Sequence, residues 1–120
     1  MRKPIKPITV SRAVLSALAA QDKARAQVDK FCARPKSAER PDDDKTLAAL
    51  CDTDMRTLWH LLDVEPVAHG DVAMILDHVA RYSAAGHVLP EREGGAFEGD
   101  LIRTAAGWLA KLDGWPAKAA

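Results

Sequence analysis

The fold of this 120-residue chain depends on the stretch TLAALCDTDMRTLWHLL, residues 46–62. Positions 47, 51, 54, 58 and 61 are apolar except for Asp54, and they step by four, three, four and three residues. That spacing is typical of one face of an unbroken α-helix. A single helix leaves the charged Asp54 in an otherwise apolar seam, which is the weak point of this interpretation. We nevertheless expect one continuous helix from a cap at Asp42–Asp44 to about Asp63.

The same 17 residues resemble the helix-turn-helix of many bacterial transcription regulators. In that pattern Asp52 would occupy the turn and Asp54 would cap the recognition helix. The other matching positions are the helix-core residues Leu47, Cys51, Leu58 and Leu61 and the small Ala48 at the helix crossing. The resemblance implies that Arg56, Thr57 and His60 would face DNA. The chain departs from the pattern at the turn, where the family prefers glycine, and at Thr53, where an aliphatic residue is usual.

Three further helices are predicted from apolar spacing and from their end signals. They cover about 11–33, with Ser11 as the N-cap; about 66–85, with Pro66 in the first turn and Gly86 as the stop; and about 98–113, with Gly114 as the stop. Four amphipathic helices with mostly short connections predict an all-α fold, a small antiparallel bundle with an extended N-terminal tail. We expect a tail over residues 1–10, a single helical domain over 11–116 and a short tail over 117–120.

The inward faces of the last two helices are predicted from the same spacing. The third helix has the stripe Ala68, Val72, Ile75, Leu76, Val79 and Ser83, flanked by Tyr82, and the fourth has Leu101, Ala105, Trp108, Leu109 and Leu112. Glycine in a helix interior costs about 1 kcal/mol relative to alanine. We therefore expect Gly107 to mark a close contact between helices.

A second resemblance covers about residues 44–113. This region is similar to a group of short, uncharacterised helical bacterial proteins whose third helix is led by proline and carries an early glycine, matched here by Pro66 and Gly70. That group implies an architecture and no activity.

Composition and charge exclude several classes of protein. Lysine and arginine number 17, as do aspartate and glutamate, so the net charge is zero and the basic footprint of a dedicated nucleic-acid binder is missing. Cys32 and Cys51 are isolated, which favours buried free thiols in a reducing cytoplasm. No apolar run approaches the length of a membrane helix. The apolar run AVLSALAA, residues 13–20, continues into a charged helical sequence and favours an ordinary helix over a signal peptide.

The four histidines, His60, His69, His78 and His87, lie nine residues apart. Nine residues turn a helix by about 900°, or half a turn beyond whole turns, so His69 and His78 point to opposite sides. His78 falls outside the predicted stripe of its helix, and we interpret the set as scattered surface histidines. The nearest approach to a metal motif is Glu65 with His69, which lacks a second pair. We predict no metal site.

No arrangement in the sequence predicts catalysis or a bound cofactor. Cys51 falls on an apolar helix face, the usual place for an inert thiol, and no phosphate-binding loop is present. We therefore expect a cytoplasmic, non-enzymatic interaction or accessory module with a protein partner and no membrane association. Self-association is part of this expectation, because the alanine-rich first helix and Trp59 offer surface for it. The alternative is a DNA-binding regulator acting through residues 46–62, with Arg56, Thr57 and His60 facing DNA.

Overall fold

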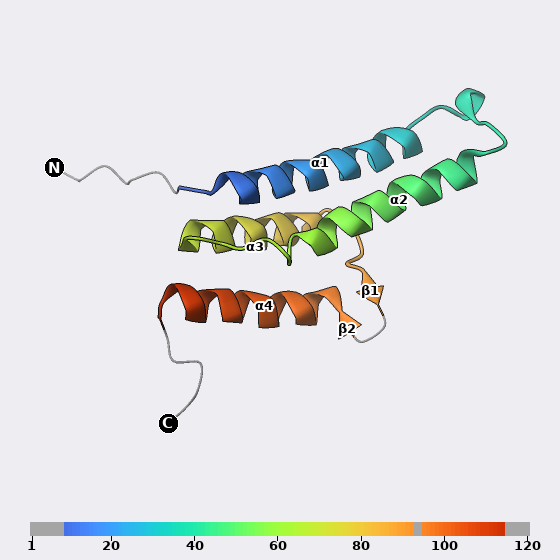
Figure 1. The fold of residues 1–120 in the computed structure, drawn as a ribbon. Helices are drawn as coiled ribbons and strands as arrows, with labels where there is room; N and C mark the ends of the chain where they lie inside the picture. Colours follow the sequence, from blue (N-terminus) through green and yellow to red (C-terminus); the bar gives the residue numbers. More distant parts are fainter. Residues whose placement is uncertain (1–8, 93–94, 115–120) are drawn as a thin grey trace.

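A computed structural model describes residues 9–92 and 95–114 (Figure 1). Within these residues the chain forms four main helices: α1 (Arg12–Cys32), α2 (Asp43–His60), α3 (His69–Ala84) and α4 (Phe97–Leu112). A 3-10 turn, η1 (Lys36–Ala38), lies between α1 and α2, and β1 (Glu91–Arg92) pairs antiparallel with β2 (Gly95–Ala96) before α4. The all-α class is confirmed. The predicted tails at 1–10 and 117–120 lie mostly or wholly outside the described residues.

Successive helices run in opposite directions, and α2 returns along α1 (Figure 1). The most extensive contact is between these two helices, whereas α3 contacts both α1 and α4. The loop that joins α1 to α2 is held by Arg34, whose guanidinium stacks over Phe31 at 3.7 Å and pairs with Asp43 at 2.9 Å. Among the described helices, none is both long and apolar enough to span a membrane.

The end signals predicted for α1, α3 and α4 are confirmed at three of their four positions. The Ser11 hydroxyl accepts a hydrogen bond from the Val14 amide at 3.4 Å, so Ser11 caps α1. Gly86 and Gly114 have positive φ angles of 91° and 63° just after α3 and α4, a conformation that glycine adopts at little cost. The placement of Pro66 in the first turn of α3 was wrong. Pro66 is buried three residues before the helix begins.

Asp71, in the first turn of α3, makes the contacts that hold the start of this helix. Its side chain is fully buried, and one carboxylate oxygen accepts the Ser11 amide at 2.6 Å while the other accepts the Val67 amide at 2.8 Å. Burial acts to raise the pKa of Asp71, but the backbone hydrogen bonds from Ser11 and Val67 outweigh it and hold the pKa below its ordinary value. One side chain therefore joins the beginning of α1 to the beginning of α3.

All four helices contribute to one hydrophobic core. Its buried members are Val14, Ala17, Leu18, Leu58, Leu61, Ile75, Val79, Tyr82, Phe97 and Leu101. Trp59 packs edge-on against Phe97, with 5.0 Å between ring centroids. The predicted inward positions Leu76 and Leu109 are instead partly exposed, at 38% and 37%. The close helix contact predicted at Gly107 is also wrong, because open space surrounds the position where its side chain would be.

Candidate functional site

The helix α2 runs without a break from Asp43 to His60, across the residues where a helix-turn-helix would turn. The continuous helix is therefore confirmed. Asp54 does not cap a second helix. It lies inside α2 with a side chain that is 1% exposed, and Thr57 bonds to its carbonyl oxygen at 2.9 Å. The turn on which the DNA-binding alternative depends is not present in the described part of the chain.

Asp54 is the centre of a buried hydrogen-bond network that joins α1, α2 and α3. The Gln21 amide donates to one Asp54 carboxylate oxygen at 2.7 Å. The Tyr82 hydroxyl donates to the other oxygen at 2.7 Å, and the Arg25 guanidinium donates to the same oxygen at 3.1 Å. We call the set Gln21, Arg25, Asp54, His78 and Tyr82 the polar junction. A charge in an apolar seam is tolerated here because three donors from two other helices surround it.

His78 completes the polar junction on α3. Its Nε2 lies 2.9 Å from the Gln21 side-chain oxygen. Because the Gln21 nitrogen faces the Asp54 carboxylate, the Gln21 oxygen faces His78, and the Nε2 atom must carry the proton and donate it. The Nδ1 atom of the neutral ring is then an acceptor. Burial lowers the pKa of His78, against the opposing effect of the Asp22 charge, so the ring is neutral at neutral pH.

The charges at the edge of the polar junction are also matched. Burial acts to lower the pKa of Arg25, but its hydrogen bonds to Asp29 and Tyr82 and the nearby carboxylates raise the pKa above its ordinary value. Burial and the Asp54 hydrogen bond raise the pKa of Tyr82 to about 12. Within the described residues no buried side-chain nitrogen or oxygen lacks a hydrogen-bond partner. The polar junction is therefore a satisfied network, the condition under which buried polar groups fix one arrangement of helices.

The interpretation of His78 as a surface histidine was wrong, because the residue is only 6% exposed. The sequence carries a signal that finds it. Asp71, Ile75, His78 and Tyr82 recur at intervals of four, three and four residues, and all are buried on one face of α3. The sequence analysis did not predict a buried Gln21 either, although Gln21 follows Val14 and Leu18 on the buried face of α1. Polar residues at positions of the apolar stripes of three helices are therefore the sequence signal that predicts the polar junction.

The other histidines do not join His78 in a metal site. His60 and His69 are exposed, at the ends of different helices. Glu65 and His69, the nearest approach to a metal motif in the sequence, pair instead with the end of α4, at 2.6 Å to Lys111 and 2.5 Å to Asp113. In residues 9–92 and 95–114 no group of three histidine, cysteine, aspartate or glutamate side chains could hold a metal ion.

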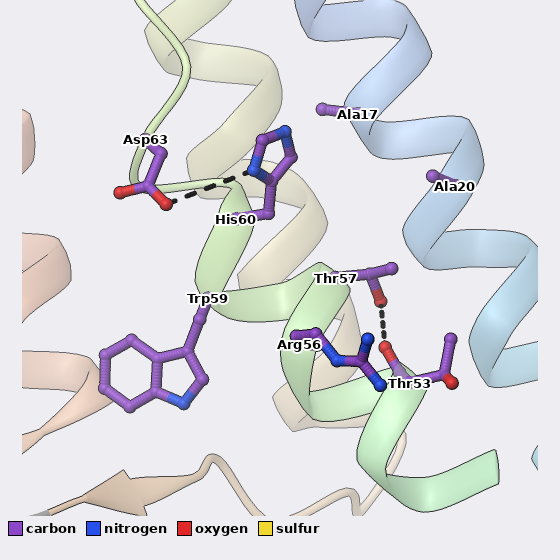
Figure 2. Close-up of a pocket in the computed structure, with 8 residues that line it drawn as sticks. All are labelled: Ala17, Ala20, Thr53, Arg56, Thr57, Trp59, His60 and Asp63. Carbon is purple, nitrogen blue, oxygen red and sulfur yellow. Dashed lines mark hydrogen bonds and ion pairs between the residues drawn. The ribbon is translucent and has the colours of Figure 1, made fainter. Parts of the chain in front are cut away.

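The larger of two cavities beside the polar junction is an open groove of about 370 Å³ between α1 and α2. Figure 2 shows the groove with the methyl groups of Ala17 and Ala20 on α1, opposite Thr53 and Thr57 of α2. The remaining residues that line it are Arg56, Trp59, His60 and Asp63. Most of the lining is apolar. We call this cavity the α1–α2 groove.

The structure brings Arg56, Thr57 and His60, the residues named in the DNA-binding alternative, together along the α1–α2 groove. The Arg56 guanidinium pairs with Asp52 at 2.6 Å, and the Thr57 hydroxyl donates to the Thr53 carbonyl at 2.9 Å. These side chains form a polar rim with matched charges on an apolar floor.

Two residues predicted from the sequence lie differently from expectation. The Trp59 ring points away from α1 (Figure 2) and packs on Phe97, so the surface expected from its indole is largely used by the core. The prediction of buried thiols was wrong for Cys32, which is exposed, while Cys51 is half-buried.

A smaller cavity of about 170 Å³ opens between α1 and α3. We call it the α1–α3 cavity. It is lined by Gln21, Asp22, Arg25, His78, Arg81, Tyr82, Ala85 and His87. The His87 ring lies 5.0 Å from that of Tyr82, in a tilted arrangement. Four of the five polar-junction residues line this cavity, which is rich in charged and aromatic groups, whereas none of them lines the mainly apolar α1–α2 groove.

Comparisons of the chain with protein-family models, with curated proteins and with solved structures give no significant match.

Proposed function

We propose that the protein is a non-enzymatic interaction module and that its α1–α2 groove accepts a bulky apolar side chain from a protein partner. The observation that carries the proposal is the open, mainly apolar groove of about 370 Å³. Burying a large apolar side chain in such a site is worth about 1.5–3 kcal/mol. Alanine on one wall leaves space that a partner can fill.

The rim of the groove favours a protein partner over nucleic acid. Arg56 is neutralised by Asp52 at 2.6 Å, and His60 lies 4.0 Å from Asp63. A polar rim with both signs of charge around an apolar floor is typical of protein interfaces. A DNA-binding face needs unmatched positive charge, and the whole chain has a net charge of zero.

The test uses two alanines that are neighbours on α1. Ala20 lines the groove, whereas Ala19 is exposed outside its lining. Ala20→Trp fills the groove, and Ala19→Trp adds the same bulk elsewhere. Isotope-labelled protein is titrated with N-acetyl-phenylalaninamide and followed by amide NMR shifts. We expect saturable shifts at Ala17, Ala20 and Thr57 in the wild type and in Ala19→Trp, and their loss in Ala20→Trp.

Shifts that are scattered over the surface, or that persist in Ala20→Trp, would contradict the proposal. Light scattering over a range of concentrations then tests whether the partner is a second copy of this chain. Self-association through the groove predicts a mass that rises with concentration in Ala19→Trp and not in Ala20→Trp. A salt-dependent shift of duplex DNA by the wild type would favour DNA binding instead.

A further inference from the structure

The α1–α3 cavity is lined by His78, whose second ring nitrogen, Nδ1, is not used by the hydrogen bonds of the polar junction. His78 is 6% exposed, and its Nε2 is committed to Gln21. Its Nδ1 faces the Asp22 carboxylate at 3.7 Å, which is too long for a direct hydrogen bond. With the ring neutral, both atoms are acceptors, and no hydrogen lies between them. A group that carries at least two N–H or O–H donors could form hydrogen bonds with both the His78 Nδ1 atom and the Asp22 carboxylate.

The charges around the cavity leave Asp22 without a full cationic partner. Arg25 is engaged by Asp29 at 2.7 Å and by Asp54 at 3.1 Å. Arg81 is engaged by Asp77 at 3.0 Å. These two guanidinium groups are therefore already matched by carboxylates, and the neutral His78 is the partner that faces Asp22. The surplus charge at the mouth of the cavity is negative, which attracts a cation.

The remaining wall is aromatic. Tyr82 and His87 face each other with 5.0 Å between ring centroids, and the Arg25 guanidinium lies 6.0 Å from the Tyr82 ring. Aromatic faces attract organic cations through the ring quadrupole. A metal ion is disfavoured, because no group of three metal-binding side chains gathers in the described residues. The chemistry therefore points to an organic cation that carries N–H donors.

We propose that the α1–α3 cavity binds a primary ammonium group, whose N–H donors bridge the Asp22 carboxylate and His78 Nδ1. The cavity volume of about 170 Å³ suits the end of a small amine or of a lysine side chain. This site is separate from the α1–α2 groove, and its occupation does not depend on the function proposed for the groove.

The probes are methylammonium, 1,4-diaminobutane, N-acetyl-lysine methylamide and tetramethylammonium, titrated at pH 8 while the His78 ring signals are followed by NMR. Tetramethylammonium carries the same charge as methylammonium but has no N–H donor. We expect saturable shifts of the His78 ring with the three primary amines and none with tetramethylammonium. Tighter binding of the lysine derivative than of diaminobutane would assign the ammonium group to a lysine side chain, and the reverse order would assign it to a free amine.

Two variants with the same loss of charge provide the control. Asp22 and Asp52 are both exposed, at 76% and 69%, so neither substitution disturbs the core. Because a hydrogen bond to a charged group is lost, we expect Asp22→Asn to weaken binding about tenfold or more. Asp52→Asn should change it less than about threefold, since Asp52 lies on α2, outside the lining of the α1–α3 cavity, and only a screened surface charge is lost. Equal weakening by both variants, equal shifts with tetramethylammonium, or no saturable shift with any primary amine would overturn the proposal.

Discussion

At the scale of single residues, Asp54 decides how the helices meet. Its partners Gln21, Arg25 and Tyr82 lie 33, 29 and 28 positions away in the sequence. The spacing of residues 46–62 could place Asp54 in the seam of a helix, but helical periodicity carries no information about donors on other helices. The position of Asp54 in an apolar seam is the weak point of a continuous helix in the sequence. In the folded protein it is the place where the donors from the other helices converge.

Replacing Asp54 by alanine should therefore be among the most damaging single substitutions in the chain. It leaves the buried Tyr82 hydroxyl without its acceptor and the Gln21 amide with only the 3.3 Å hydrogen bond to the backbone carbonyl of residue 54, and we expect a loss of about 3 kcal/mol or more in the free energy of unfolding. Urea unfolding measures this loss. The matched control is Asp52→Ala, which removes an exposed ion pair with Arg56 and should cost less than about 1 kcal/mol. Similar losses in both variants would show that the polar junction is not a stabilising unit.

His78 should make stability depend on pH near neutrality. The unfolded chain protonates a histidine at about pH 6.5, whereas burial lowers the pKa of His78 in the folded state. The stability it contributes is therefore present above about pH 6.5 and is lost as pH falls toward the folded-state pKa. Unfolding of the wild type and of His78→Gln between pH 8 and pH 5 tests this. We expect the wild type to lose stability more steeply on acidification, and parallel pH profiles would contradict the assignment.

At the scale of the elements, the signals that act within a few residues were predicted correctly. Ser11 caps α1, and Gly86 and Gly114 end α3 and α4, because each depends only on local backbone geometry. The start of α3 was misplaced at Pro66, since the true start depends on Asp71 contacting an amide of another helix. The candidate groove was foreseen only in part. Its alanine wall follows from the composition of α1, but the direction of the Trp59 ring, away from α1, does not.

Gly107 offers a test of how α4 is packed. Its position is exposed, lies in the middle of a helix and has free space where a side chain would lie. Gly107→Ala should therefore raise the free energy of unfolding by about 0.5–1 kcal/mol. Gly86→Ala, by contrast, should lower it, because Gly86 has a φ angle of 91°. Thermal or urea unfolding of the two variants should move in opposite directions, and a destabilised Gly107→Ala would indicate a helix contact that the structure lacks.

Asp71 links the starts of α1 and α3, and this link should be sensitive to acid. Backbone hydrogen bonds hold its folded-state pKa below the unfolded value of about 3.9. Its contribution is therefore present above that pH and is lost as pH falls through the folded-state pKa. We expect Asp71→Asn to be about 1–3 kcal/mol less stable at pH 7, with the difference shrinking toward pH 3. A difference that is constant over that range would argue against the carboxylate contacts.

At the scale of the whole molecule, the polar junction connects three helices, lines the α1–α3 cavity and has sequence neighbours that line the α1–α2 groove. Ala20 lines the α1–α2 groove, and the next residue, Gln21, lines the α1–α3 cavity. Similarly, Thr53 and Thr57 of the groove flank Asp54 along α2. The geometry of both candidate sites therefore depends on the same set of hydrogen bonds, and the chain from Asp54 through Gln21 to His78 is the central element of the structure.

The most direct test of that chain is the protonation state of the His78 ring, which long-range nitrogen–proton NMR correlations report for each ring nitrogen. At pH 7.5 the structure predicts a neutral ring with the proton on Nε2, donated to Gln21, and a bare Nδ1. In Gln21→Leu this preference should weaken, because the acceptor is removed. A wild-type His78 ring that carries its proton on Nδ1, or that titrates as an exposed histidine near pH 6.5, would contradict the account.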